Sequence, residues 1–277
     1  MGTKITVLAE NTVRGRIEAL GEAGISFFLE TDSGNYLFDT GRGHVIVHNA
    51  LVFRKDLGSL KKILLSHSHP DHTGGLDKVL RLTGEIEVMA HPDIFLQRVR
   101  MRDRERVPTG VPFTRDYLEA MGARFHLSRD FDPVAPGICL TGEVPRRTTF
   151  ETGDYAGRFL ITEDGMIPDP ILDDQSLVLD TPDGLVIVLG CAHAGIVNII
   201  THVLEKTGNS RVRAVLGGTH LAFSAPEQLT ASLEALKQFD LGGIGVSHCT
   251  GLEASARVAK EFGDRAFYCN VGTILEF

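Results

Sequence analysis

The chain has 277 residues, 43% of them apolar, and a formal net charge of -8 at pH 7. This length and composition suffice for one large core, and the acidic balance excludes a global positive field that would hold DNA or RNA. No apolar run approaches the ~20 residues of a membrane span, and residues 1–10 lack the apolar core of a signal peptide. The four cysteines form no CxxC pair, which argues against a zinc ribbon or a disulfide scaffold. We therefore expect a cytoplasmic protein.

Short strand-like runs alternate with helical patterns along the whole chain. The sequence predicts strands over residues 5–8, 26–29, 36–38, 63–65 and 87–89. A Thr-Pro-Asp-Gly turn separates two further apolar runs, over residues 176–180 and 185–189, and predicts a β-hairpin. Helical periodicity covers residues 76–82, 196–205, 227–239 and 253–262. The alternation predicts an α/β protein whose sheets are mixed rather than purely parallel.

Histidines follow the ends of several apolar runs. Four runs end in one or more small residues and then a histidine, namely His67, His193, His220 and His248. In α/β proteins ligands bind outside the carboxyl ends of strands, so these four side chains are expected to converge on one site. Each of them alone is as compatible with a loop histidine at a sheet edge.

The densest group of potential metal ligands lies directly after the strand expected at residues 63–65. His67, His69, Asp71 and His72 fall within six residues, just before two glycines that open a helix. Imidazole nitrogens and a carboxylate suit zinc, iron or manganese, and a loop can direct alternate side chains toward two ions. A polar loop that is rich in histidine by chance seldom has this spacing, so the pattern favours a metal site.

This His-x-His-x-Asp-His pattern resembles the signature of the metallo-β-lactamase superfamily. The resemblance implies an αββα sandwich of two mixed sheets flanked by helices, formed by residues 1–277 as one domain with an inserted segment around residues 93–130. It also implies two divalent metal ions, zinc foremost, with iron or manganese as alternatives. His67 and His69 would bind one ion, Asp71 and His72 the other.

The resemblance extends to motifs later in the chain, with departures. His248 matches the last ligand of the second metal. Where the superfamily often has an aspartate that bridges the metals, this chain has Gly-Cys-Ala-His; His193 is the first choice as the replacement ligand and Cys191 the second, and a thiolate there would favour softer metals. The third motif lacks its histidine, so that Glu143 is the one candidate unless His220 or water compensates.

Asp39 matches a buried aspartate that accepts a hydrogen bond from the metal loop and so orients a ligand. The alternative is a simple turn aspartate. Within the superfamily, segments along nearly the whole chain resemble the subgroup named after 7,8-dihydropterin-6-methyl-4-(β-D-ribofuranosyl)-aminobenzene-5'-phosphate synthases. The segments are residues 10–12, 38–41, 67–72, 90–92, 141–146, 173–176, 190–195, 217–220, 248–251 and 271–273. A subgroup name does not fix a substrate.

The predicted activity is hydrolysis of a small anionic phosphoester, ester or lactone by a metal-bound hydroxide. Asp71 and His220 are the candidate catalytic residues; His220 would donate to the substrate or act as general acid, or else only support a ligand. Arg146 is the candidate phosphate-binding residue. The chain has no Gly-x-Ser-x-Gly motif that would indicate serine catalysis.

Two other functions stay open. One is a pterin-related condensation with loss of pyrophosphate, and the other is a metal-binding or redox module without hydrolytic activity. The arginine-rich segment from Arg98 to Arg106 is either a solvated face paired with its own acids or a lid that recognises anions. The expected partner is a small molecule, with neither nucleic acid nor membrane.

Overall fold

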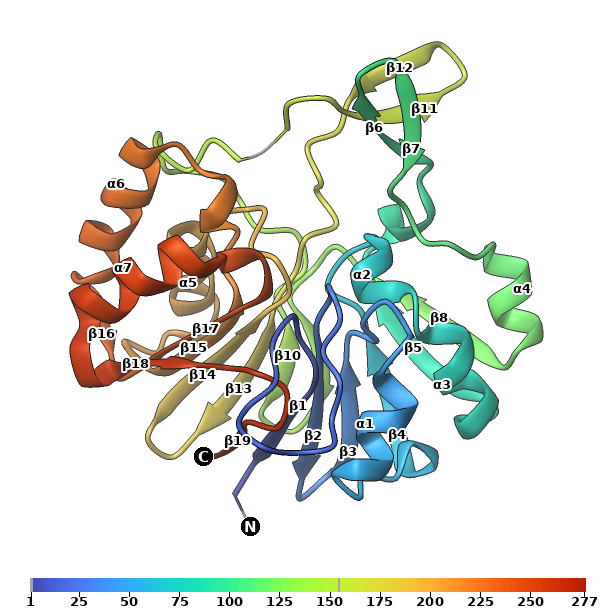
Figure 1. The fold of residues 1–277 in the computed structure, drawn as a ribbon, viewed down its shortest axis with the longest axis horizontal. Coiled ribbons are helices and arrows are strands. Elements are labelled where there is room, and N and C mark those ends of the chain that lie inside the picture. The colour runs from blue at the N-terminus through green and yellow to red at the C-terminus, as the bar shows by residue number, and fades with distance from the viewer. Residues whose placement is uncertain (1, 154) are drawn as a thin grey trace.

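Strand β14 (Gly184–Leu189) is buried along its whole length and faces two different cores. In the computed structural model, which describes residues 2–153 and 155–277, Ile187 and Leu189 pack in a core beneath helices. Val186 and Val188 pack in a second core, against the other sheet. A strand that is apolar on both faces requires cover on both, and here one cover is a sheet and the other a helical layer (Figure 1).

The first sheet is mixed, with antiparallel pairs at one side and parallel pairs at the other. Apolar residues of α1, α3 and α4 cover its outer face. Its strands, in spatial order, are β19 (Ile274–Glu276), β1 (Lys4–Ala9), β2 (Ser26–Thr31), β3 (Gly34–Phe38), β4 (Leu60–Leu64), β5 (Ile86–Ala90) and β8 (Ala123–Leu127). Its helices are α1 (Ile46–Val52), α2 (Pro70–Thr73), α3 (Leu76–Thr83) and α4 (Arg115–Ala120).

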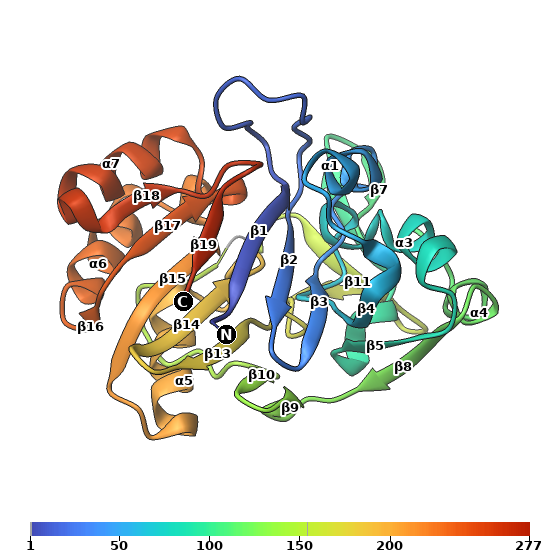
Figure 2. The same ribbon diagram turned by 90° about the horizontal axis from the view of Figure 1, so that it is seen from below.

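The second sheet is also mixed, and helices α5, α6 and α7 cover its outer face. Its strands are β18 (Ala266–Tyr268), β17 (Ile244–Ser247), β15 (Arg211–Gly218), β14, β13 (Leu177–Thr181), β10 (Ile138–Leu140) and β9 (Asp132–Ala135), with β16 (Asp240–Leu241) also beside β15. Its helices are α5 (Ile196–Thr207), α6 (Pro226–Leu236) and α7 (Leu252–Phe262). Figure 2 shows the two sheets from below, with the helical layers outside.

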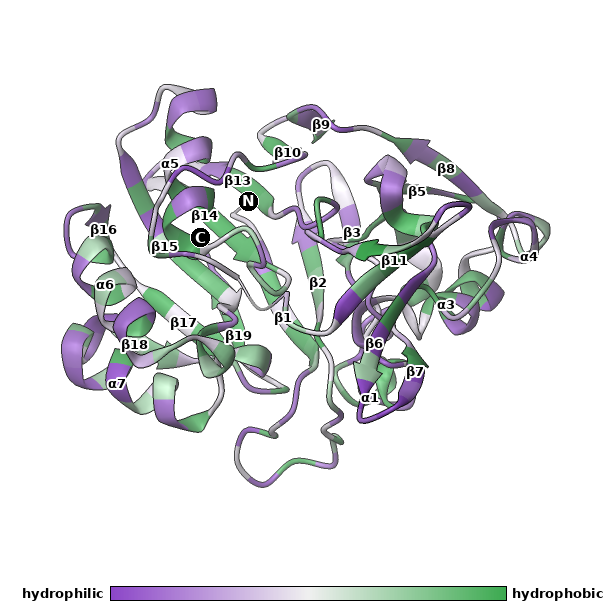
Figure 3. Cartoon of the chain, turned by 90° about the horizontal axis from the view of Figure 1, so that it is seen from above, coloured by the Kyte–Doolittle hydropathy of each residue, from purple (hydrophilic) through white to green (hydrophobic). Residues whose placement is uncertain are grey.

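A third, four-stranded sheet stands apart from the sandwich, and we call it the arm. Its order is β12 (Gly165–Pro168), β11 (Arg158–Thr162), β6 (Arg98–Arg102) and β7 (Glu105–Pro108). The arm thus joins hairpins from two distant parts of the chain, and its outer strands β7 and β12 are fully exposed. Figure 1 shows it projecting beyond the carboxyl ends of the sandwich strands, and Figure 3 shows β6 as largely hydrophilic.

The predicted α/β class and the αββα sandwich are confirmed, as are the hairpin β13–β14 and the four predicted helices. One boundary was wrong: the helix expected to reach residue 239 ends at Leu236, because residues 237–239 turn into β16, which pairs with β15. The arm was not predicted as a sheet, because β6 pairs with β11 from a distant part of the chain, and no local pattern indicates that pairing. In the part of the chain that the structure describes, no helix is long and apolar enough to cross a membrane.

Arg98 fastens the arm to the sandwich. Its guanidinium is buried and donates to Asp169 Oδ2 at 2.9 Å and to Asp173 Oδ1 at 2.8 Å. The same group donates to Ser68 Oγ at 2.7 Å, within the segment that carries the expected metal ligands. Because both carboxylates are also buried, this charged network is stable only when it is complete.

We predict that Arg98→Ala lowers the free energy of unfolding by about 3–5 kcal/mol, because it leaves two buried carboxylates without their cation. Chemical denaturation followed by circular dichroism measures the effect. The matched control is Arg104→Ala in the exposed turn of the same hairpin, which should change stability by less than about 0.5 kcal/mol. Equal effects of the two substitutions would contradict the role of Arg98.

Candidate metal centre

The carboxyl ends of strands from both sheets meet at one edge of the sandwich. In the second sheet β14, β15 and β17 run parallel to one another, and His193, His220 and His248 follow their ends. In the first sheet His67 follows the end of β4, with Pro70 beginning the short helix α2. The expected convergence of the four histidines is therefore what the fold produces, because parallel neighbours end at the same edge.

Three of the histidines form a group with nitrogen ligands only. His67 Nε2 lies 2.9 Å from His69 Nδ1, and ligand atoms of His67, His69 and His193 all lie within 4.8 Å of one another. The rings are buried, and neither ring nitrogen of His193 has a hydrogen-bond partner among the described residues. Buried polar atoms normally have partners. Nitrogens that bind one zinc ion at about 2.0–2.1 Å stand about 3.3 Å apart, so this group fits a divalent metal.

Asp71, His72 and His248 form a second group, of mixed nitrogen and oxygen character. Their ligand atoms also lie within 4.8 Å of one another, and His248 Nε2 is 3.4 Å from Asp71 Oδ2. Burial opposes ionisation of Asp71, but the hydrogen bond from His248 and the charge of His72 hold its pKa well below the usual range. The carboxylate is therefore ionised at neutral pH, as a metal ligand must be.

Cys191 lies between the two groups. Its Sγ is 3.2 Å from His72 Nε2 and within 4.8 Å of the ligand atoms of both His67 and His72. It shares a further group of the same kind with His193 and His220. Burial raises the pKa of the Cys191 thiol, and the neighbouring Cys249 adds to this shift. A divalent cation reverses such a shift, because a coordinating thiol is deprotonated.

Burial lowers the pKa of His67, His69 and His193 well below the usual range. These imidazoles are therefore neutral at pH 7, which is the form that binds metals. His72 differs: burial lowers its pKa too, but the Asp39 carboxylate outweighs burial, so that the pKa is raised. The Asp39 contact thus places a proton on His72 Nδ1, whereas Nε2 faces Cys191.

Asp39 holds the histidine loop, residues 67–72, in place. Its carboxylate accepts hydrogen bonds from Ser66 N at 2.7 Å, from Ser66 Oγ at 2.6 Å and from His72 Nδ1 at 2.6 Å. The His72 bond leaves Nε2 as the free nitrogen on the metal side, and Ser66 Oγ also contacts His67 Nδ1 at 2.9 Å. Asp39 itself has a left-handed backbone, with φ 60°, an uncommon conformation that turns its side chain under the loop.

Two supporting residues near the N-terminus had no assigned role in the sequence interpretation. Glu10 is buried and accepts from the backbone N of His248 at 2.6 Å, and Asn11 Oδ1 lies 2.9 Å from His248 Nδ1. The Asn11 contact at Nδ1 orients the ring so that Nε2 faces Asp71. The contacts span almost the whole chain, so no local spacing could reveal them, although both residues lie in a segment that carries the family resemblance.

A second support joins the loops of the two sheets. Asp173 Oδ2 accepts from Ser68 N at 2.8 Å, and Gln175 donates from Nε2 to Leu65 O at 2.9 Å. Between them, Asp174 Oδ2 accepts from Ala194 N at 2.9 Å, next to His193. This connection fixes the loop after β14 relative to the histidine loop.

A cavity of 580 Å³ opens onto both ligand groups. His69, Asp71, Cys191, His193 and His248 all line it, so the metal ligands are accessible to a small molecule. The volume lies within the usual range for ligand pockets, about 300–1,000 Å³. A sealed site, which would favour a purely structural metal, is therefore not present among the described residues.

His220 lies in the wall of this cavity. Its ring centroid is 4.2 Å from that of His193 and 4.8 Å from that of Phe223. Its backbone has φ 56° and its N–H donates to Cys249 Sγ at 3.2 Å. The side chain is thus held beside the ligands and exposed to the same space, where both a donor role and a supporting role are geometrically accessible.

Two residues that the sequence suggested for the site, Glu143 and Arg146, lie outside the ligand groups and the cavity lining. Glu143 belongs to none of the ligand groups of the described residues; its carboxylate accepts from Arg129 at 2.9 Å, on a partly exposed surface. Arg146 does not line the cavity. Its guanidinium lies over the Tyr155 ring, contacts the Tyr155 hydroxyl and donates to the carbonyl of Ile171 at 3.0 Å.

Comparison with known families decides the identity of the fold. A model of the metallo-β-lactamase superfamily matches residues 21–241, which include Asp39, the histidine loop, Cys191 and His220. The chain belongs to the metallo-β-lactamase superfamily. His248 lies after the matched region.

This superfamily member is similar over its full length to characterised proteins. It is 31% identical to a 7,8-dihydropterin-6-methyl-4-(β-D-ribofuranosyl)-aminobenzene-5'-phosphate synthase of Methanocaldococcus jannaschii, over 99% of this chain and 96% of the relative. A crystal structure described as a metal-dependent hydrolase of the β-lactamase superfamily superimposes with a TM-score of 0.84, at 25% identity and 99% coverage of both chains.

We predict that Asp39→Asn weakens metal binding about 10–100-fold, as loss of a hydrogen-bonding partner behind a ligand typically does. An asparagine has one acceptor oxygen and would present its amide nitrogen to a donor, so the bonds to Ser66 and His72 cannot all persist. Competition with a metal chelator measures the affinity. The control is Asp183→Asn in the exposed turn between β13 and β14, and unchanged affinity in both variants would contradict the prediction.

Proposed function

We propose that this protein is a dinuclear metal-dependent hydrolase that acts on a small anionic molecule. The observation that carries the proposal is the pair of ligand groups on either side of Cys191, both opening onto one cavity. Superfamily membership supports a metal-dependent enzyme. The neutral imidazoles and the ionised Asp71 support a site prepared for cations.

In this proposal His67, His69 and His193 hold one ion, and Asp71, His72 and His248 hold the other. His193 would thus compensate for the histidine missing from the third motif, and Cys191, which lies between the two groups, would be a further ligand. From the sequence, His193 was the first choice to replace the bridging aspartate and Cys191 the second. We now prefer Cys191, because the loop after β14 brings His193 to His69 while Cys191 faces His72.

Two divalent ions at such a site lower the pKa of a shared water and polarise the bond under attack. The chain's own groups set the geometry of that chemistry. Asp71 contributes a negative charge that accepts a proton or hydrogen bond at the cavity floor, and His220 stands at the wall, placed to donate a proton to a leaving group. Zinc is the leading candidate metal, with iron or manganese as alternatives.

A condensation of the pterin-related type is the second candidate. It is supported by the named synthase at 31% identity. Release of pyrophosphate from a pterin donor would distinguish it from hydrolysis. A module without catalysis is the third candidate, and the open cavity weakens it because a structural metal site needs no access for a substrate.

Metal analysis of the purified protein tests the proposal first. We predict about two metal ions per chain for the wild type, and partial loss in both His69→Ala and His193→Ala, since each variant removes a ligand of the first group. The control is His44→Ala, whose residue belongs to none of the ligand groups. No metal above background in the wild type after metal-supplemented purification would overturn the mechanism.

The position of Cys191 has a spectroscopic test. We predict that the cobalt-substituted protein shows a sulfur-to-cobalt charge-transfer band, and that Cys191→Ser removes the band, because only a bound thiolate produces it. Cys139→Ser is the matched control, since Cys139 lies in β10 and in none of the ligand groups. A band that persists in Cys191→Ser would assign the sulfur ligand to Cys249 instead.

A further inference from the structure

Arginines are concentrated in the cavity, although the chain as a whole is acidic. Arg42, Arg100, Arg102 and Arg158 line it, whereas Asp71 is the one carboxylate among those of its lining residues that the structure describes. The net charge of the chain is -8, so this concentration runs against the overall balance. A concave wall of one sign focuses the electrostatic field and raises the local concentration of ligands of the opposite charge.

Three of these arginines lie together on one face of the arm. Arg158 of β11 is the cross-strand partner of Arg100 of β6, so the two side chains stand side by side. Arg102 follows Arg100 by two residues and therefore points to the same face of β6. This alignment concentrates positive charge on the face of the arm that lines the cavity.

The arm positions these groups over the metal centre. Arg98, on the same strand, is held by Asp169, Asp173 and Ser68, which fixes the base of β6 to the histidine loop. Arg98 is thus fully engaged in structure, whereas no ion pair joins Arg100 or Arg102 to a carboxylate within residues 2–153 and 155–277. Their guanidiniums are available to a ligand.

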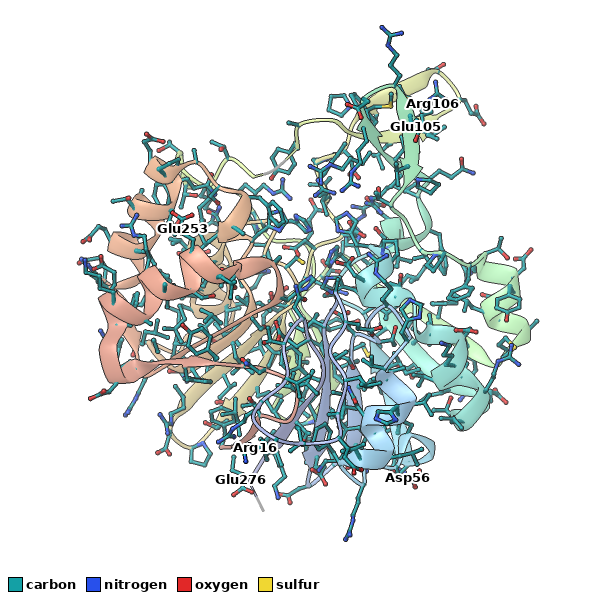
Figure 4. All side chains as sticks on the ribbon, in the orientation of Figure 1. Arg16, Asp56, Glu105, Arg106, Glu253 and Glu276 are labelled. Carbon is teal, nitrogen blue, oxygen red and sulfur yellow. The ribbon has the colours of Figure 1, made fainter. Side chains whose placement is uncertain are left out.

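The remaining arginines of the hairpin behave differently. Arg104 and Arg106 are exposed and do not line the cavity. Figure 4 shows Arg106 and Glu105 at the outer part of the arm, away from the sandwich. The segment from Arg98 to Arg106 therefore divides into a buried anchor, a pair that faces the cavity and a solvated tip.

We propose that the arm forms an anion subsite in which Arg100 and Arg102, beside Arg158, bind a phosphate group of the substrate that is separate from the bond being broken. Guanidinium forks match phosphate oxygens in bidentate fashion. Phe223, which is 54% exposed, also lines the cavity and offers an apolar surface to the rest of the molecule. The substrate class is an organic molecule that carries a phosphate. This inference deepens the proposed hydrolase function and rests on it for the reacting bond.

Calorimetric titration with pyrophosphate tests the subsite in the metal-loaded protein. The test variant is Arg100→Gln/Arg102→Gln, and the matched control is Arg104→Gln/Arg106→Gln, which removes two charges from the same hairpin. We expect the test variant to lose between about tenfold and a hundredfold in affinity, because charge-assisted hydrogen bonds are lost. The control should stay within about twofold, since Arg104 and Arg106 do not line the cavity and their charges act on the anion only through solvent that contains salt.

Equal losses in the two double variants would overturn the proposal, because they would show a general effect of charge. An unchanged affinity in the test variant would overturn it as well. A further variant, Arg100→Lys/Arg102→Lys, controls for misfolding. Lysine keeps the positive charge but lacks the bidentate guanidinium, so we expect a pyrophosphate affinity below that of the wild type and above that of the glutamine variant. Thermal unfolding should show the same melting temperature for all these variants.

A His69→Ala background separates the subsite from the metal centre. If the arm binds pyrophosphate, the affinity difference between the glutamine variant and its control persists when metal binding is impaired. If the difference disappears, the anion is held by the metals and the arm proposal fails. Should the wild type prove to lack metal altogether, the hydrolase proposal fails while a persisting difference still supports the anion subsite.

Discussion

The hydrogen bonds accepted by two buried carboxylates hold the metal centre together. Asp39 fixes the histidine loop from beneath, through Ser66 and His72, and Asp173 fixes it from the side, through Ser68 and Arg98. Without these bonds several buried imidazoles would have to find new partners at the junction of two sheets. The network therefore determines which ring nitrogens face the metal side and which are protonated.

The same network links the centre to the proposed anion subsite. Arg98 contacts the histidine loop and also anchors β6. The strand that carries Arg100 and Arg102 is therefore held in a fixed position relative to the metal-ligating residues. A small movement of the loop would therefore shift both the metals and the arm. This coupling is physically reasonable for an enzyme whose reacting bond and remote binding group must be held at a fixed separation.

Much of the centre was predictable because its signals are local. The histidine loop, the strand ends before His193, His220 and His248, and the hairpin after residue 176 are all encoded in short stretches of sequence. Glu143 and Arg146 were placed in the site by their position in motifs, but each has a nearer partner, Arg129 and Tyr155 respectively. The arm was missed because its sheet joins β6 to β11, which lie far apart in the sequence, and local patterns do not specify that pairing.

The sequence by itself determined the residue types available for metal binding, the family resemblance and the elements that carry them. Only the tertiary structure decided how those residues are grouped, with Cys191 between the two sets and His193 beside His69. It also divided the arginines of one hairpin into an anchor, a cavity wall and an exposed tip. The physical reason is that these arrangements depend on contacts between sheets and on left-handed loop residues such as Asp39 and His220, which residue spacing along the chain does not specify.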